Sequence, residues 1–318
     1  MILTVTPNAA VDKTYRVDGF QIDRVNRPTL THTVAGGKGI NVARVYQTLG
    51  GEAIVTGFLG GLNGRIVARA LEKEEITEQC VRVSGETRLC SAVIDPTNGT
   101  QTEINEPGHE ITRREQTSLL RRFESLLSQV SFHFVVLSGS LPPGASDDLY
   151  AELIARAKSR DIRTVLDTSG AALKIGLDAH PYFAKPNRAE LAGIGYSIES
   201  DADLSETARK LTTEAVDVLA VTLGEDAALF VTHDGTALRS FPPKIEFASA
   251  VASGDSFLAA YLWSWSHGAK PEDYREALRL ATGAGAANAA VIGAGFCTCD
   301  AIFACAEQSR IETLNFEA

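Results

Sequence analysis

A short turn in the last third of the chain combines small residues with a single acidic side chain. Residues 251–257 read Val-Ala-Ser-Gly-Asp-Ser-Phe, so Asp255 stands where the turn opens an apolar helix. Backbone N–H groups at a helix start lack intrahelical partners and attract phosphate. A carboxylate there does not help to hold phosphate, but it can take a proton from an alcohol that attacks one. The turn therefore predicts phosphoryl transfer, unless Asp255 merely caps the helix or meets its dipole.

Two features near the N-terminal end add candidate ligand contacts. Residues 35–41 read Ala-Gly-Gly-Lys-Gly-Ile-Asn, so Lys38 brings positive charge to a predicted helix start. The run matches neither a Walker loop nor a dinucleotide fingerprint, and a tight turn with a solvated lysine is the alternative. Asp12 follows the first predicted strand, where a carboxylate can accept hydrogen bonds from sugar hydroxyls or can simply belong to a turn.

A third group of motifs points to a nucleotide. Lys185 and Asn187 follow a predicted strand, and Glu190 lies three residues after Asn187, the spacing of a helix capping interaction. The functional alternative places Lys185 and Asn187 near a triphosphate, with Glu190 acting on magnesium through water. Thr222 and Gly224 end another strand, where glycine lets a nucleotide approach the backbone. Residues 282–288 are unusually small, which suits close helix packing or a shallow wall for adenine.

The elements that must position these residues alternate between strand and helix. This alternation predicts an α/β fold with a largely parallel sheet covered on both faces. The predicted strands are 2–6, 53–58, 134–138, 164–167, 182–184 and 218–222. The predicted helices are 42–49, 64–74, 113–128, 147–159, 205–213, 255–266 and 273–291. The last third is predicted as consecutive helices with little strand between them.

Two stretches interrupt the alternation. Residues 13–33 show polar alternation without an amphipathic helix, and 88–105 hold two β-rich runs joined by Pro-Thr-Asn-Gly. Asn-Gly between such runs is a strong hairpin signal. The two stretches together predict a small separate sheet that acts as a lid or meets a partner subunit, with ordinary surface hairpins as the alternative.

Composition limits the classes of partner. The 318 residues carry 22% charged and 44% hydrophobic side chains and a formal net charge of −10. An acidic chain disfavours broad binding to nucleic acid or anionic membranes. No run approaches the roughly 20 apolar residues that span a bilayer. The five cysteines form neither a complete disulfide framework nor a zinc pattern, and we expect reduced thiols and a cytoplasmic location.

Taken together and in this order, the motifs resemble the ribokinase (PfkB) superfamily of carbohydrate kinases. The runs Thr-Pro-Asn-Ala-Ala-Val-Asp, Gly-Gly-Lys-Gly-Ile-Asn-Val-Ala-Arg and Gly-Ser-Leu-Pro-Pro-Gly look like its hexose-phosphate branch. That branch includes 1-phosphofructokinase, tagatose-6-phosphate kinase and a minor 6-phosphofructokinase. The resemblance implies a ribokinase-like fold: a kinase domain of residues 1–12, 34–87 and 106–318, and a β-sheet lid of 13–33 and 88–105, often joined to a second lid in a homodimer.

The resemblance also assigns roles to individual residues. Asp255 matches the catalytic base, and Ala252, Ser253 and Gly254 match the rest of the anion hole. The positions that contact the sugar are Asp12, Gly37 and Asn41. The positions that contact its phosphate are Lys38, Arg88 and, as a weaker match, Arg27. The nucleotide side comprises Lys185, Asn187, Thr222, Gly224, Gly254 and Asn288, with Glu190 in the magnesium-linked motif.

The implied reaction uses ATP and Mg²⁺ to phosphorylate a ketohexose monophosphate. Fructose 1-phosphate, giving fructose 1,6-bisphosphate, is the first expectation, followed by tagatose 6-phosphate and fructose 6-phosphate. A catalytically weak sugar-phosphate sensor is the alternative from another class, and a nicotinamide-dependent dehydrogenase ranks last. One residue departs from the family signature: Ala252 stands where glycine is usual. A left-handed backbone there would cost alanine about 1–2 kcal/mol, and we expect instead a helical conformation that makes the methyl group harmless.

Overall fold

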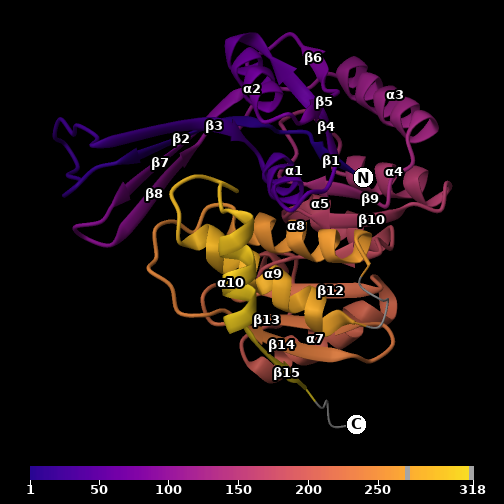
Figure 1. Ribbon diagram of the computed structural model, residues 1–318. Helices are drawn as coiled ribbons and strands as arrows, with labels where there is room; N and C mark the ends of the chain where they lie inside the picture. The colour runs from indigo at the N-terminus through magenta and orange to yellow at the C-terminus, as the bar shows by residue number, and fades with distance from the viewer. Residues whose placement is uncertain (269–272, 315–318) are drawn as a thin grey trace.

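A computed structural model describes residues 1–268 and 273–314, and its main element is a twisted sheet (Figure 1). Within these residues the sheet has 11 strands in the order β15-β14-β13-β12-β11-β10-β9-β1-β4-β5, with β6 paired to β4. Their bounds are β1 Ile2–Thr6, β4 Ala53–Gly60, β5 Thr77–Glu78, β6 Val81–Val83, β9 Phe134–Ser138, β10 Arg163–Asp167, β11 Phe183–Ala184, β12 Val218–Thr222, β13 Ala228–Thr232, β14 Ala237–Phe241 and β15 Arg310–Thr313.

The sheet is parallel from β12 to β5 and antiparallel beyond β12. The six predicted strands all occur, with shifts of up to two residues at their ends. The sequence analysis missed the antiparallel strands β13, β14 and β15. Each of these strands has only four or five residues, too few for its periodicity to separate a strand from a helix segment, and here the pairing partners decide.

Helices cover both faces of the sheet, which explains why its central strands β1, β4 and β9 are buried along their whole length. On one face lie α1 Lys38–Thr48, α2 Gly61–Lys73, α8 Ser253–Ser266, α9 Tyr274–Ala289 and α10 Cys299–Gln308. On the other lie α3 Arg113–Gln129, α4 Leu149–Lys158, α5 Gly170–Asp178, α6 Arg188–Gly193 and α7 Asp201–Glu214. Successive residues of β1 serve opposite faces: Ile2 packs in the first apolar cluster and Leu3 in the second.

A second sheet projects from the body of the molecule (Figure 1). It has four strands in the order β3-β2-β7-β8, with bounds β2 Ala10–Arg16, β3 Leu30–Gly36, β7 Arg88–Asp95 and β8 Thr100–Asn105. The expected small sheet is therefore present, although β2 and β3 extend beyond 13–33 and include Asp12. Whether this small sheet is a separate lid domain stays a prediction, and residues 269–272 and 315–318 of the predicted kinase domain lie outside the described residues.

One buried carboxylate ties the two hairpins of the small sheet together. Asp95 is 2% exposed and accepts hydrogen bonds from the backbone N–H groups of Gly19 and Phe20, at 2.9 and 2.8 Å. It also accepts from the backbone of Thr97 and the side chain of Asn98, in the tip that joins β7 to β8. The pairing of β2 with β7 and this carboxylate make the two predicted stretches one structural unit.

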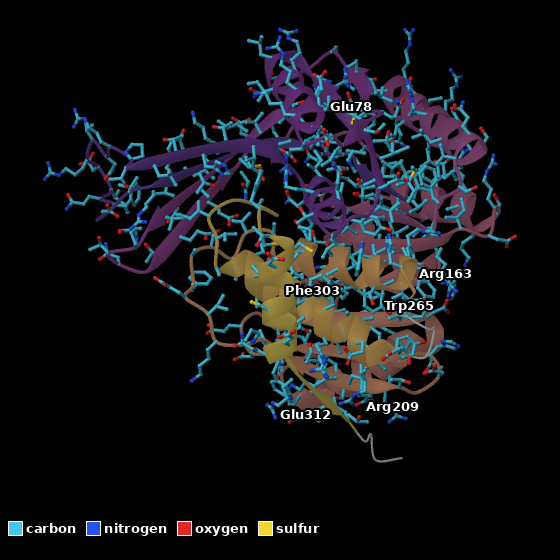
Figure 2. The ribbon with its side chains drawn as sticks, viewed as in Figure 1. Glu78, Arg163, Arg209, Trp265, Phe303 and Glu312 are labelled. Carbon is cyan, nitrogen blue, oxygen red and sulfur yellow. The ribbon has the colours of Figure 1, made fainter. Side chains whose placement is uncertain are left out.

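The amino ends of the parallel strands lie away from the small sheet. There Arg163 of β10 lies 5.8 Å from the ring of Trp265 at the end of α8 (Figure 2). The opposite, carboxyl ends of β1, β9, β10, β11 and β12 face the small sheet, and the predicted ligand motifs follow these ends. Among residues 1–268 and 273–314, no helix combines the length and apolar character needed to cross a bilayer.

Candidate active site

Two adjoining cavities lie at the carboxyl edge of the main sheet. The first, of about 500 Å³, is bounded by β2, β7 and β8 of the small sheet and by the start of α8. The second, of about 770 Å³, lies between the segments that follow β12 and β14 and the helices α8 and α9. Asn187, Thr222 and Gly254 line both cavities. The start of α8 therefore stands at the junction of the two, where a group bound in one cavity can meet a group bound in the other.

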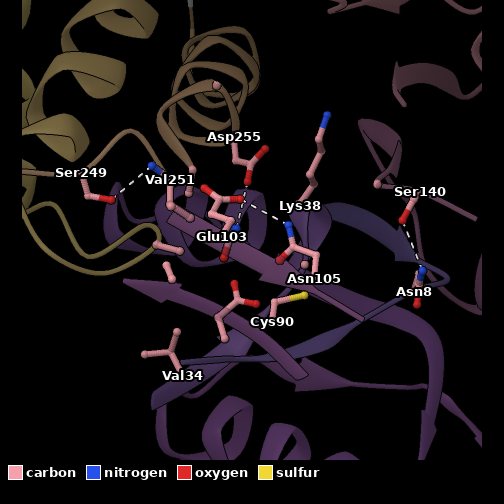
Figure 3. A pocket seen from close by; sticks show the side chains of 18 of the residues that line it. Asn8, Val34, Lys38, Cys90, Glu103, Asn105, Ser140, Ser249, Val251 and Asp255 are labelled. Atoms are coloured by element: carbon pink, nitrogen blue, oxygen red, sulfur yellow. Dashed lines mark hydrogen bonds between the residues drawn. The ribbon is translucent and has the colours of Figure 1, made fainter. Parts of the chain in front are cut away.

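Asp255 lies in the first turn of α8 and lines the first cavity (Figure 3). It is 6% exposed, and its Oδ2 accepts a hydrogen bond of 2.9 Å from Nδ2 of Asn41. Burial raises the pKa of Asp255 to about 6, the neighbouring Asp167 adds to the rise, and Lys38 and Lys185 oppose it. A carboxyl group with this pKa is ionised at pH 7 yet remains a useful proton acceptor.

The turn before Asp255 has the left-handed backbone that the sequence analysis did not favour. Ala252 has φ 66° and ψ 9°, whereas we expected a helical conformation for this residue. The reason is geometric: the chain must reverse at Ala252 so that α8 can begin at Ser253, and its carbonyl accepts from the N–H of Ser256 at 2.8 Å. The N–H groups of Gly254 and Asp255 thus belong to the first helical turn, which has no intrahelical acceptors.

Asp12, Gly37 and Arg88 meet at the first cavity, as do most of the predicted substrate contacts. Burial raises the pKa of Asp12 to about 6, although the Arg88 and Arg44 guanidinium groups lower it. Gly36 packs so tightly against Asp12 that a Cβ there would lie 2.0 Å from Cγ of the aspartate. Arg88 is held by hydrogen bonds from its Nε to the Asn8 carbonyl, at 3.1 Å, and from its Nη1 to the Glu106 carbonyl.

A charged cluster lies beside Asp255, at the end of β10. Asp167 is fully buried, with Nζ of Lys38 2.9 Å from Oδ1 and Nζ of Lys185 3.2 Å from Oδ2. Burial by itself raises the pKa of Asp167, but the attraction of Lys185 and Lys38 outweighs burial. The pKa is therefore lower than usual, and the carboxylate is ionised. Nζ of Lys38 also lies 3.3 Å from Glu190, and in Figure 3 this lysine points away from the small sheet. Its predicted contact with the phosphate of a sugar stays a prediction.

The nucleotide-side motifs gather around the junction and the second cavity. Asn187 caps α6, and Glu190 returns the bond, so the capping box considered from the spacing is present. The same two side chains line the first cavity, so the structural role does not remove them from the site. Asn187 also bridges Thr222 at the end of β12, and Gly224 (φ 69°) lines the second cavity.

Two predicted contacts do not reach either cavity. Arg27 is exposed in the connection between β2 and β3 and lines neither of them. Asn288 is fully buried in α9, where Nδ2 donates to the Val251 carbonyl at 2.7 Å and Oδ1 accepts from the Gly295 N–H at 2.8 Å. Asn288 therefore braces the turn before Ser253 from α9 by a direct hydrogen bond.

The sequence analysis missed several site residues. Asp167 ends a predicted strand, and this position at the carboxyl end of a strand was the signal available for it. Asn8 and Ser140 line the first cavity, and Nδ2 of Asn8 donates to Oγ of Ser140 at 3.2 Å; neither was named as a site residue. Glu103 on the edge strand β8 lines the same cavity, which only the pairing of β7 with β8 reveals.

The comparisons with known proteins agree with this geometry. Residues 5–301 match the family described as pfkB family carbohydrate kinase. A 1-phosphofructokinase from Rhodobacter capsulatus is 37% identical over 282 residues, which are 88% of each chain. A solved structure titled as a possible 1-phosphofructokinase from Thermotoga maritima is 27% identical, with a TM-score of 0.89 over 99% of this chain and 100% of that one.

A ribokinase from Arabidopsis thaliana has a TM-score of 0.73 over 96% of this chain and 98% of that one, and at 18% identity it supports the fold alone. The ribokinase-like fold, the resemblance and the kinase class that the sequence predicted are confirmed. The chain is a homologue of 1-phosphofructokinase, and a kinase of this family takes ATP as a substrate. This protein belongs to the pfkB family of carbohydrate kinases.

Proposed function

We propose that the protein phosphorylates a ketohexose monophosphate with ATP, and that fructose 1-phosphate is its substrate and fructose 1,6-bisphosphate its product. The observation that carries this proposal is the place of Asp255, buried at the junction of two cavities and beside the amides of a helix start. The 1-phosphofructokinase homologue supports the choice of sugar. Tagatose 6-phosphate and fructose 6-phosphate are the runners-up, since all three are anionic ketohexoses of similar size.

The first cavity would hold the sugar phosphate. Asp12 accepts hydrogen bonds from sugar hydroxyls, and the Asn41 amide and the Gly37 backbone approach the same ring. Arg88 pairs with the phosphate already on the sugar, since a guanidinium binds phosphate through two parallel hydrogen bonds. Binding this phosphate selects a phosphorylated sugar over a free one, because a free sugar leaves the Arg88 guanidinium without an anionic partner.

Asp255 would accept the proton of the attacking hydroxyl, which is the 6-hydroxyl when fructose 1-phosphate is bound. The hydroxyl oxygen forms a bond to the γ-phosphorus of ATP, and the bond from that phosphorus to the bridging oxygen breaks. ADP leaves with that electron pair, and Asp255 later releases the proton to solvent. The amides of residues 252–255 and the ammonium groups of Lys38 and Lys185 stabilise the charge on the transferred group.

The second cavity would hold the nucleotide, with Thr222 and Gly224 at its edge and Lys185 and Asn187 near the triphosphate. The residues present fit magnesium only through water: residues 1–268 and 273–314 contain no group of three or more metal-ligating side chains. The Glu190 carboxylate lines the cavity, and oxygen atoms suit this cation. When bound, Mg²⁺ would neutralise part of the charge on the phosphates of ATP.

The small sheet would join a second copy of the chain to form a homodimer. Its strands β3 and β8 are edges, Leu30 and Ile104 are large apolar side chains exposed on them, and Ile22 and Val25 are exposed in the connection between β2 and β3. Exposed edges and apolar groups of this kind are normally covered by a partner. Arg27, exposed in the same connection, would be a phosphate contact only in such an assembly. Light scattering after gel filtration should give twice the 33.9 kDa of one chain, and we expect the enzyme in the cytoplasm.

A coupled assay of ADP formation with ATP, magnesium and each of the three sugars tests the proposal. Fructose 1-phosphate should give the highest kcat/KM, and the 6-phosphates should give lower values. Equal inactivity with all three sugars contradicts the hexose-phosphate assignment. If these sugars raised the melting temperature without turnover, the protein would be a sensor, the alternative that the strained Ala252 favours.

A further inference from the structure

Arg44 is a buried cation that the proposed reaction does not use. It lies in α1 with 5% of its surface exposed, and its guanidinium is fully bonded. Nε and Nη2 donate to the Glu74 carboxylate at 2.6 and 3.2 Å, and Nη2 also donates to the Ala35 carbonyl. Nη1 donates to the Ala294 carbonyl at 2.7 Å and to Oδ1 of Asn41 at 3.0 Å. Burying a guanidinium is costly, so its network needs an explanation.

The bond to Asn41 determines which way the Asn41 amide faces. Arginine has five N–H donors and no acceptor, so only Oδ1 of Asn41 can face it. The NH₂ group of Asn41 must then point the other way, where it donates to Oδ2 of Asp255 at 2.9 Å. Asn41 and Arg44 are three residues apart on one helix, which keeps both side chains on the same face.

The second half of the network reaches the turn that precedes Asp255. Arg44 bonds the carbonyl of Ala294, and the next residue, Gly295, donates its N–H to Asn288. Asn288 donates in turn to the Val251 carbonyl and to Oγ of Ser253. Arg44 thus supports both the carboxylate and the turn before α8, without touching either.

We propose that Arg44 is a positioning residue that fixes the Asn41 amide and thereby keeps Asp255 ionised and directed at the attacking hydroxyl. The proposal rests on the proposed function, in which Asp255 is the base. It leaves Oδ1 of Asp255 to receive the proton, because Oδ2 is taken by Asn41.

Other charged side chains also face Asp255, and they are the same in the wild type and in the variants compared below. They are Asp167 on β10, Lys38 on α1 and Lys185 after β11. The charged residues that line the first cavity add Asp12 and Lys13 on β2, Arg88 on β7, Glu103 on β8 and Glu190 on α6. Because Arg44 also lowers the pKa of Asp12, the readout is kcat at saturating sugar phosphate and ATP, where the binding of the sugar no longer limits the rate.

The experiment measures kcat against pH for the wild type, Arg44→Met, Asn41→Leu and the double variant. On the acidic side of this profile kcat falls as Asp255 takes up a proton, and we call this fall the acidic limb. In Arg44→Met the acidic limb should move up by about one pH unit, because the hydrogen bond from Asn41 to ionised Asp255 is lost. Asn41→Leu should shift the limb by a similar amount, and adding Arg44→Met to it should cause no further shift. The proposal is overturned if the shift in the double variant equals the sum of the two single shifts. It is also overturned if the acidic limb of Arg44→Met lies at the same pH as that of the wild type.

Two further variants separate positioning from folding. Arg156→Met removes another ion-paired arginine, which lies on α4 and bonds Glu124 and Glu152. It should lower the melting temperature without moving the limb. Should Arg44→Met fail to fold, Arg44→Lys decides by the same readout, because a single ammonium group on a shorter stem does not span Asn41 and Glu74. Normal turnover by Asp255→Asn would instead defeat the proposed function, a different result from an unmoved limb.

Discussion

Because the backbone at Ala252 is left-handed, the replacement Ala252→Gly should stabilise the protein, whereas the same replacement in a helix would destabilise it. Alanine in this region costs about 1–2 kcal/mol, and glycine does not pay that cost. Glycine loses about 0.5–1 kcal/mol more conformational entropy on folding, so the net gain is about 0.5–1 kcal/mol. With about 2.1 cal/mol/K of unfolding entropy per residue, the 318 residues make 1 kcal/mol worth about 1.5 °C. The melting temperature should therefore rise by about 1 °C.

The opposite sign is expected if Ala252 were helical. Glycine in a helix interior is about 1 kcal/mol less favourable than alanine, so the melting temperature would then fall. The matched control is Ala155→Gly, at an exposed position within α4, and it should lower stability by that amount. Differential scanning calorimetry of both variants beside the wild type gives the comparison.

The activity of Ala252→Gly should stay within about twofold of the wild type, because the N–H groups of the turn are unchanged and a twofold rate change is only about 0.4 kcal/mol. The branched replacement Ala252→Val should destabilise by more than about 2 kcal/mol, since β-branched residues are outliers in this conformation. A fall in melting temperature for Ala252→Gly that matches the Ala155→Gly control would refute the strain argument.

The remaining predictions concern the two cavities. Because burial raises the pKa of Asp12 and Asp255 to about 6, each loses its charge as the pH falls below 6. A plot of log(kcat/KM) for the sugar phosphate, corrected for the titration of the substrate, should approach a slope of 2 there, and a slope of 1 in the wild type would contradict this. Gly36→Ala should displace Asp12 and raise the KM for the sugar about tenfold or more while the KM for ATP is unchanged; an unchanged sugar KM would show that the carboxylate does not contact the sugar. Lys38→Met should lower kcat and leave the sugar KM unchanged, whereas a raised sugar KM with normal kcat would support the contact predicted from the sequence.

The sequence predicted the parallel part of the fold because its strands are buried on both faces and therefore form apolar runs. The resemblance to the carbohydrate kinases also implied that Asp12, Asn41 and Asp255 belong to one site. They meet because the carboxyl ends of parallel strands share an edge, and α8 begins at that edge. The first conclusion depends on local pattern and topology, which residue types reveal, whereas the second came from the family motifs.

Other features depend on packing that residue types do not reveal. The backbone at Ala252 is set by the reversal of the chain before α8, and a non-glycine residue gives no sign of it. The small residues around Asn288 in the sequence suit either a nucleotide contact or a bond to a buried carbonyl. Only the packing of α9 shows that its side chain bonds the Val251 carbonyl. Asp167 and Arg44 have ordinary positions in a strand and a helix, and only their burial shows that they are unusual.

The most direct test of the account is single-turnover phosphoryl transfer by Asp255→Asn, with ATP binding measured on the same preparation. The amide keeps the shape of the side chain and removes its ability to accept the proton. The account predicts a fall in the transfer rate of about 10²–10⁴-fold, with the Kd for ATP unchanged. A transfer rate close to that of the wild type would contradict the assignment of Asp255 as the base.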